Sequence, residues 1–421
     1  MKRFTSLLAV AFSFSTAGII AADETVIHVE LLVREAIERN PKIIAARERH
    51  SMLREKIPQA GALDDPMLGF GVVNLPSDFD FNEEDMTMKE ISVAQKFPFP
   101  GKRDLIKEAA AIEADAGAAD VDEIANQVEK DVKTAFYDLS HVYRAMEVTR
   151  RTKGLLEELS KITQTRYALG RGIQEDIIRI QVEISKMLDE LIMFEQKKLS
   201  LEARLNYLLN RPQNSPVGRP AEFDFRRVVF SSEELQQLAL TNNPMLRALK
   251  QEIAAGGKIV ESAKLDYLPD FSLKFAYGQR DDRLDMYTGM IEMNLPIFVK
   301  SKQERKVAEG NAEVRAAQAK YNSAKNEIFY TITDMGSMLQ RLERKIELYR
   351  TGIIPQSRLQ IDTAMSAYMV NKADFMTLLD SRMRLYRYVL DYHDALTEYE
   401  KSLTALETAV GTKLLPREIT Q

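Results

Sequence analysis

The clearest pattern along the chain is a strict heptad between residues 173 and 210. Two columns of residues, each spaced by seven, are apolar at nine of ten positions. This spacing places both columns on one face of a helix and is typical of coiled-coil packing. The pattern therefore predicts a helix whose seam packs on another helix. The columns are Ile177, Ile184, Leu191, Lys198, Leu205 and Ile180, Met187, Phe194, Leu201, Leu208.

The seam returns 201 residues later with smaller and more polar side chains, and other landmarks return with it. Asn40-Pro41 recurs as Asn243-Pro244, and the turn sequence at 167–170 recurs at 368–371. A repeat of this length exceeds the units of solenoid proteins and indicates duplication of a whole structural half. We therefore expect repeat 1 over 23–212, a linker over 213–230, repeat 2 over 231–412 and a tail over 413–421.

Each half is expected to hold two shorter helices beside one long helix. No proline interrupts 101–167, so a helix about 100 Å long is expected there. The two shorter helices add up to nearly the same length, so each half should form one rod. Gly154 and Pro355 stand at equivalent points and predict either a bend or a local irregularity without function. The expected helices are 29–60, 101–167 and 173–210, then 232–264, 300–368 and 373–411.

Between the first helix and the long helix of each half, the apolar residues alternate with a period of two. In repeat 2 the apolar residues fall on odd positions of 271–277 and 287–295. In repeat 1 the alternation is looser, with Met67, Gly69, Gly71 and Val73 assigned to the same face as Ile91, Val93 and Phe97. Such alternation is typical of membrane barrel strands. The expected strand pairs are 66–75 with 87–98, and 269–278 with 286–296.

Four strands are too few to close a barrel, so several copies of the chain must combine. Three copies would supply twelve strands, whereas hairpins packed on a soluble core are the alternative. Proline stands at each expected junction between strand and helix, where its fixed φ ends strand pairing. These junctions are Pro66, Pro98, Pro269 and Pro296. Pro66 recurs 203 positions on and Pro98 recurs 198 positions on, which places insertions in the hairpin loop and in the long helix.

Composition narrows the class of protein. The net charge is −5 without a basic cluster, which argues against nucleic acid as a partner. Cysteine is absent, which excludes disulfides, thiolate metal sites and cysteine catalysis. Lys2-Arg3, an apolar run and Ala21-Ala22 predict a secretory signal peptide over 1–22. A membrane anchor is the weaker alternative because the apolar run is too short to span a bilayer.

No constellation of residues predicts catalysis. The chain shows no Ser/His/Asp set, phosphate loop or carboxylate pair, and its four histidines lack ligand spacing. Its 18 methionines favour packing or lipid contact over soft-metal binding, since Met290 and Met293 should point to opposite faces. We therefore expect no enzyme activity, no cofactor and no metal site.

Two segments resemble a known family. ISVAQKFPFPGKR at 91–103 and IEMNLPIFVKSK at 291–302 resemble the strand-to-helix signature of the outer membrane efflux proteins, the TolC family. The turns at 167–170 and 368–371 resemble its periplasmic tip turns. QKFPFPGKR is similar to the heavy-metal branch that includes CzcC and CusC. The resemblance covers essentially the whole chain after the signal peptide.

The resemblance implies an α+β membrane protein with four strands per chain. Three chains would form a 12-stranded outer-membrane β-barrel that continues into a long periplasmic α-helical coiled-coil barrel. Such a homotrimer, set in outer membrane lipid, is the passive exit duct of a tripartite efflux system. Its partners are a periplasmic adaptor (membrane fusion) protein and an inner-membrane RND-type pump. Its cargo would be small toxic solutes, with heavy-metal cations as one class.

The resemblance also assigns roles at the periplasmic end. The adaptor would contact the tip residues Gly170, Arg171, Gly172, Asn371, Lys372 and Ala373. Relatives narrow their tunnel just beyond the tip, where Asp176 aligns with Thr377 and Arg179 aligns with Asp380. We hypothesise that these four residues form a gate that charge pairing holds shut in a trimer. An ordinary solvated helix face is the alternative.

Two other functions fit the same elements. One is the outer-membrane channel of a type I protein secretion system, which would use the same fold with an ATP-driven exporter. The other is a periplasmic coiled-coil adaptor or tether without a pore. The sequence does not choose the substrate.

Overall fold

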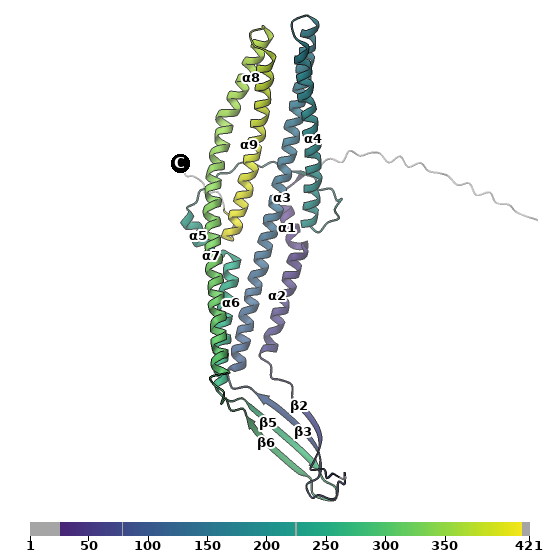
Figure 1. The fold of residues 1–421 in the computed structure, drawn as a ribbon, viewed down its shortest axis with the longest axis vertical. Helices are drawn as coiled ribbons and strands as arrows, with labels where there is room; N and C mark the ends of the chain where they lie inside the picture. The colour runs from purple at the N-terminus through teal and green to yellow at the C-terminus, as the bar shows by residue number, and fades with distance from the viewer. Residues whose placement is uncertain (1–25, 78, 224, 415–421) are drawn as a thin grey trace, which may run out of the picture.

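The computed structural model describes residues 26–77, 79–223 and 225–414, which form a long rod (Figure 1). Helices make up the body, a four-stranded sheet stands at one end, and two tight turns between helices stand at the other. The expected signal peptide and residues 415–421 of the expected tail lie outside the described residues. Within the described part of the chain, no helix combines the length and the apolar composition needed to cross a bilayer.

Both halves contain the same elements in the same order. Repeat 1 has α1 (Val29–Arg39), α2 (Pro41–Ala60), β2 (Met67–Val73), β3 (Met88–Phe97), α3 (Lys102–Ala168) and α4 (Gln174–Leu208). Repeat 2 has α5 (Ser232–Asn242), α6 (Pro244–Lys264), η1 (Leu265–Tyr267), β5 (Phe271–Gln279), β6 (Met286–Met293), α7 (Gln303–Leu348), η2 (Tyr349–Ile353), α8 (Ile354–Met369) and α9 (Phe375–Val410). A short parallel pair, β1 (Val26–Ile27) with β4 (Arg219–Pro220), ties the start of repeat 1 to the linker.

The first helix of each half is broken in two, which corrects the single helices expected over 29–60 and 232–264. The breaks fall at Asn40 and Asn243, whose backbones are extended (ψ 124° and 120°) and which each precede a proline. Each asparagine side chain accepts a hydrogen bond from the next helix, Asn40 from Lys42 N–H at 2.9 Å and Asn243 from Leu246 N–H at 3.1 Å. Proline cannot donate to the preceding turn, so the asparagine–proline pair ends one helix and begins the next.

The same two asparagines also fix the end of the last helix in their half. The Nδ2 group of Asn40 donates to the carbonyl of Leu208 at 2.7 Å, and that of Asn243 donates to the carbonyl of Ala409 at 2.9 Å. These carbonyls lie in the last turns of α4 and α9, where carbonyl groups have no hydrogen-bond donor within their own helix. The recurrence of Asn-Pro therefore has a structural cause in both halves.

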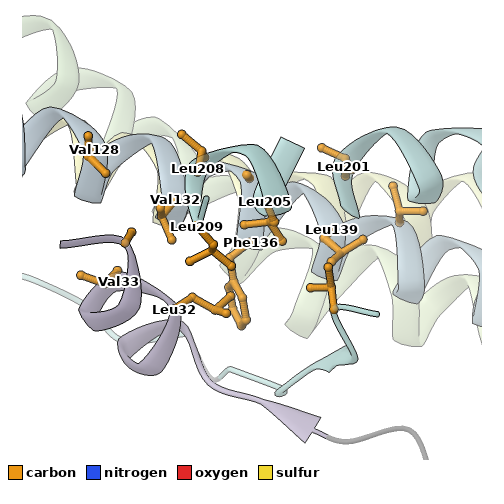
Figure 2. Close-up of a cluster of buried hydrophobic side chains, with 14 of the residues drawn as sticks. Leu32, Val33, Val128, Val132, Phe136, Leu139, Leu201, Leu205, Leu208 and Leu209 are labelled. Atoms are coloured by element: carbon orange, nitrogen blue, oxygen red, sulfur yellow. The ribbon is translucent and has the colours of Figure 1, made fainter. Parts of the chain in front are cut away.

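α3 is the central helix of the rod. It packs on α2 and α4 of its own half and on α6 and α9 of the other half. Figure 2 shows the core where α1 meets the end of α4 against α3. Seven of the ten heptad positions in α4 are buried, which agrees with the predicted seam. The remaining three, Ile177, Leu191 and Lys198, are half-buried.

The two halves carry matching cores, and their offsets locate the insertions between the repeats. Leu32 and Ala36 correspond to Leu235 and Ala239 at an offset of 203. In the long helices the buried residues match at an offset of 200: Val128, Val132, Leu139, Val142 and Met146 correspond to Ile328, Ile332, Leu339, Leu342 and Ile346. Beyond η2 the offset is 201, as for Leu156 with Ser357 and Thr163 with Ala364.

The offsets change the interpretation of two features. The step from 200 to 201 coincides with η2, a π-helical turn, which accommodates one extra residue within a helix. Pro355 lies just after this turn, while Gly154 lies within an uninterrupted α3, so only the second half is irregular there.

The step from 203 to 200 falls between α6 and α7. At the core-based offset of 200, Pro98 corresponds to Phe298, whereas the sequence match pairs it with Pro296.

The sheet is antiparallel with strand order β2-β3-β5-β6, so β3 and β5 join the two halves. Met67 pairs with Ala94 and Gly69 pairs with Ser92, and residues directly opposite share a face. The face assigned to repeat 1 from the sequence was therefore wrong for β2. Its outward residues Leu68, Phe70 and Val72 join Ile91 and Val93, because glycines on the other face obscured the alternation. Met290 and Met293 do point to opposite faces, opposite Lys274 and Phe271 respectively.

Candidate functional site

The two turns at the far end of the rod have the same backbone conformation. Gly170 and Asn371 both take left-handed φ values, 69° and 61°. In each turn an N–H donates back across five residues, from Arg171 to the carbonyl of Arg166 and from Lys372 to the carbonyl of Ala367, both at 2.8 Å. This geometry normally favours glycine, and asparagine tolerates it better than most residues. The expected tip residues at 170–172 and 371–373 all lie in these turns.

Arg166, which the sequence did not single out, links the two tips. It lies near the end of α3, and its Nη1 donates to the carbonyl of Tyr368 at 3.0 Å. Its other amino group donates to the side-chain oxygen of Asn371, and its guanidinium lies 4.3 Å from the centre of the Tyr368 ring. Tyr368 is buried and packs on Phe375 at the start of α9. The turn of repeat 2 is therefore held against the last turn of α3.

A second polar contact joins the halves farther from the tip. The hydroxyl of Tyr386 on α9 lies 2.8 Å from that of Thr149 on α3 and donates to the carboxylate of Glu190 on α4. Thr149 is fully buried and Tyr386 nearly so. Burial and the Glu190 hydrogen bond raise the pKa of Tyr386, so the hydroxyl stays protonated as a donor. Three helices from both halves meet at this one side chain.

The four expected gate residues lie beyond the tip turns, but a single chain does not bring them together. Arg179 donates to Glu175 of its own helix, with Nε–Oε1 at 2.8 Å, and Asp380 pairs with Arg384 of its own helix at 2.7 Å. The backbone N–H of Thr377 donates to the side chain of Asp374, which caps the start of α9. Arg179 and Thr377 are exposed, while Asp176 and Asp380 are half-buried.

Carboxylates from the two halves influence each other at this end. Partial burial raises the pKa of Asp176, and the neighbouring carboxylates of Glu175 and Asp374 raise it further. Asp374 comes from the other half, so the two tips are near enough to influence each other. The pKa of Asp374 is lowered because its carboxylate accepts hydrogen bonds from Thr377.

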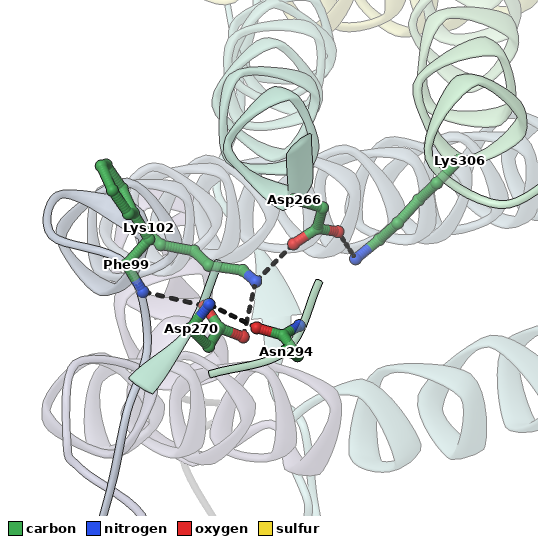
Figure 3. Close-up of polar contacts among 6 residues, drawn as sticks. All are labelled: Phe99, Lys102, Asp266, Asp270, Asn294 and Lys306. Atoms are coloured by element: carbon green, nitrogen blue, oxygen red, sulfur yellow. Dashed lines mark hydrogen bonds and ion pairs between the residues drawn. The ribbon is translucent and has the colours of Figure 1, made fainter. Parts of the chain in front are cut away.

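At the opposite end, an ion network fixes the joint between sheet and helices (Figure 3). Lys102, the first residue of α3, pairs with Asp266 and lies 3.4 Å from Asp270. Asp270 accepts from the backbone N–H of Phe99 at 2.8 Å, and Asp266 also pairs with Lys306 of α7 at 2.6 Å. The side chains of Lys102, Asp266 and Asp270 are more than four-fifths buried.

The four expected junction prolines lie at or near the ends of the four strands. Pro66 directly precedes β2 and Pro98 directly follows β3, whereas Pro269 and Pro296 stand two and three residues from their strands. Among the described residues, no group of three or more histidine, aspartate or glutamate side chains could hold a metal ion.

Comparisons with known proteins bear on the fold and the family. Residues 235–412 match the family model for outer membrane efflux protein. No curated protein sequence matches the chain. The crystal structure of CusC has a TM-score of 0.78 at 15% identity, covering 91% of this chain and 92% of that one.

Two further solved structures have the same fold. VceC from Vibrio cholerae has a TM-score of 0.76 at 18% identity, covering 92% of this chain and 97% of that one. The open state of the MtrE channel from Neisseria gonorrhoeae has a TM-score of 0.76 at 16% identity, covering 93% and 91%. These likenesses establish the fold over nearly the whole chain. The family recognised from the sequence is confirmed.

Proposed function

The chain belongs to the outer membrane efflux protein family, and we propose that three copies form a passive exit duct through the outer membrane. The sheet would lie in the membrane, and the helical rod extends into the periplasm. The main observation behind this proposal is that the sheet at the end of the helical rod has one apolar face and one polar face. Its outer face is apolar and exposed, including Phe70 (74%), Phe275 (57%) and Ile291 (72%). Apolar side chains exposed in a continuous band are typical of a lipid-facing surface.

The other face of the sheet has the composition of a water-filled lumen. It carries the ion pair between Glu90 and Lys274, at 3.1 Å, and small residues such as Gly69, Ser92 and Ala276. Four strands leave both edges open, so a closed wall needs further copies of the chain. Three copies would give twelve strands and a lumen wide enough for solutes. A transport role, rather than an enzymatic one, follows from this family and architecture.

Gating would take place at the tips. In a closed ring, each Arg179 would face an Asp380 of a neighbouring half, because the two positions are equivalent in the repeat and opposite in charge. The Arg166 contact and the Tyr386 contact support the closed arrangement, since the first holds the turn of repeat 2 against α3 and the second holds α9 against α3. Asp176 and Thr377 would line the same constriction. The tip turns at 170–172 and 371–373 present the surface for a periplasmic adaptor.

We propose an inner-membrane RND-type pump as the energy source, working through the adaptor, because the chain has no nucleotide-binding loop of its own. Small toxic solutes are the proposed cargo. Heavy-metal cations are the first class to test, because the segment QKFPFPGKR is similar to the heavy-metal branch and the chain shares its fold with CusC. Protein export in a type I system is the alternative with the same fold.

The deciding experiment is a deletion strain challenged with divalent metals, copper, silver and a drug panel, together with a protein-secretion assay. We expect sensitivity to at least one small solute and restoration by the plasmid-borne gene. The purified chain should need detergent for extraction and should have the mass of a trimer. A chain that is extracted without detergent as a monomer would support a tether without a pore and overturn the duct.

A further inference from the structure

In the part of the chain that the structure describes, the two outer strands of the sheet each have one edge that pairs with no other strand. β2 and β6 are the first and last strands of the sheet. Beyond β6, the exposed apolar side chains continue at every second position, with Leu295 at 68% and Ile297 at 73%. Long exposed strand edges readily pair with another chain. These features point to a second copy of the same chain as the occupant of both edges.

The internal repeat supplies a template for that pairing. Within one chain, β3 of repeat 1 pairs with β5 of repeat 2, and Val93 lies opposite Phe275. The helices before the sheet match between repeats at an offset of 203, and the helices after it match at 200. The hairpins agree with these values, since Val93 lies opposite Leu68 and its counterpart Met293 lies opposite Phe271. The pair Val93 and Phe275 joins β3 to β5. At these offsets the residue equivalent to Phe275 is Val72 on β2, and the residue equivalent to Val93 is Met293 on β6.

We propose that β6 of one copy pairs antiparallel with β2 of the next, with Val72 opposite Met293 and Phe70 opposite Leu295. The proposal rests on the trimeric duct and specifies how its copies join. Residues 294 and 295 would continue β6 as far as Pro296, in the way that residues 94–97 continue β3 beyond its pairing with β2. The exposed side chain of Leu295 would thereby join the lipid-facing surface.

The side chains give an independent check on this register. Val72 and Phe70 lie on the outer face of β2, and Met293 lies on the outer face of β6. The proposed pairs therefore bring apolar residues together, whereas a slip of one residue would place glycine or glutamate opposite them. The sequence match of Pro98 with Pro296 would give a register two residues away, with Phe70 opposite Met293. That register also preserves the faces, so an experiment must separate the two.

The helices and charges support the same docking. α3 packs on α6 and α9 of the other half, while α7 packs on α5, α6 and α9, all in its own half. α7 therefore lacks the neighbours that its counterpart has. Lys302 corresponds to Lys102 at the offset of 200, and within the described residues it has no ion pair. At the offset of 203 the partners of Lys102, Asp266 and Asp270, correspond to Leu63 and Met67, so the equivalent carboxylates are missing. Between them lie Asp64 and Asp65, exposed carboxylates without an ion pair in the described residues, which Lys302 would approach in the docked pair.

Because the chain contains no cysteine, paired cysteine substitutions test the register directly. We would prepare Val72→Cys with Met293→Cys, and Phe70→Cys with Leu295→Cys, in the full-length protein in membranes under mild oxidation. Directly opposed residues have Cα atoms about 4.5–5.5 Å apart, within the range for a disulfide. We expect covalent dimers and trimers on non-reducing gels from both pairs, at several times the yield of the control Phe70→Cys with Met293→Cys.

The outcomes separate the register from the duct. Higher yield from the control pair would overturn the register and favour the proline-based one. Trimers by mass with no cross-link from any pair would overturn the pairing of β6 with β2 while leaving the duct in place. A purified chain that is only monomeric would overturn the proposed function itself. Single-cysteine variants should give no covalent dimers or trimers on non-reducing gels. If they did, the cross-link could not be assigned to these two strands.

Discussion

At the scale of single residues, Asn371 shows why one position departs from the repeat. Its counterpart Gly170 needs only the left-handed backbone, which glycine adopts freely. Asn371 holds the same conformation and also offers an amide oxygen to Arg166. Glycine has no such acceptor. Asparagine at this position therefore adds a contact between the halves at the tip.

Arg166→Ala should loosen the tip. The change removes two hydrogen bonds and a contact with the ring of Tyr368, worth together about 1–3 kcal/mol. We expect higher single-channel conductance in planar bilayers and greater cell sensitivity to large antibiotics. Lys161→Ala is the matched control, since Lys161 lies exposed on the same helix, outside the adaptor-contact turns. Equal conductance in both variants would show that Arg166 does not help to close the tip.

Glu400 on α9 provides a second prediction, from its protonation. Burial raises its pKa to about 7, although a hydrogen bond from Tyr137 favours the charged form. Nearby Glu407 raises the pKa, whereas Arg226 and Lys133 lower it. Because the folded chain holds this proton more tightly than the unfolded chain, the contribution to stability is present at low pH. It is lost as the pH rises from about 4.5 to 7.

Glu400→Gln should remove this pH dependence. The amide stays neutral, so the variant should lose less stability than the parent between pH 5 and 8, with a difference of at most about 3 kcal/mol. Thermal midpoints of the detergent-purified protein across that range would measure the effect. Glu313→Gln, at an exposed position on α7, is the control. Parallel curves for parent and Glu400→Gln would show that Glu400 is already charged in the folded protein.

At the scale of elements, the twin asparagines make a prediction about helix joints. Asn40→Ala and Asn243→Ala each remove a helix cap, worth about 0.5–2 kcal/mol, and leave a buried carbonyl unpaired at about 1–3 kcal/mol. We expect both variants to lower the thermal midpoint to a similar degree, because the contacts are equivalent. Asn242→Ala, beside Asn243 but without these bonds, should change it little. A large loss at one asparagine only would contradict the structural equivalence of the joints.

Elements differ in how far the sequence determines them. The α4 seam was predictable because burial repeats every seven residues along one helix. The face of β2 was not, because Gly69 and Gly71 lie on the lumen side and leave no polar side chain to mark it. The contact of Arg166 with Asn371 joins residues 205 positions apart, and no periodicity within either half signals it. Sequence periodicity reports burial within an element, whereas contacts between halves depend on their packing.

At the scale of the whole molecule, the proposed trimer of duplicated rods would be a ring in which joints within a chain alternate with joints between chains. Joints within a chain carry the buried network of Lys102 with Asp266 and Asp270. Joints between chains would use Lys302 with Asp64 and Asp65, which are exposed in the single chain. Exposed pairs contribute little, about 0–1 kcal/mol each. The ring should therefore flex between chains before it flexes within one, and opening at the tips should follow the joints between chains.

This alternation gives the last prediction, a charge exchange at the gate. In one chain Arg179 and Asp380 pair only with their own helices, in exposed contacts that are easily exchanged. If the ring closes by pairing them across halves, Arg179→Asp should open it. Three pairs of about 0.5–1 kcal/mol each would shift the closed–open equilibrium roughly ten- to hundredfold.

The double variant Arg179→Asp with Asp380→Arg decides between a gate and a solvated face. It restores opposite charges in exchanged positions, so conductance and antibiotic sensitivity should return toward the parent values. Two single variants that behave as the parent would indicate an ordinary solvated helix face. A double variant more open than either single one would show that each charge acts only through Glu175 or Arg384 in its own helix. Only pairing across halves predicts recovery, because that contact alone depends on both positions together.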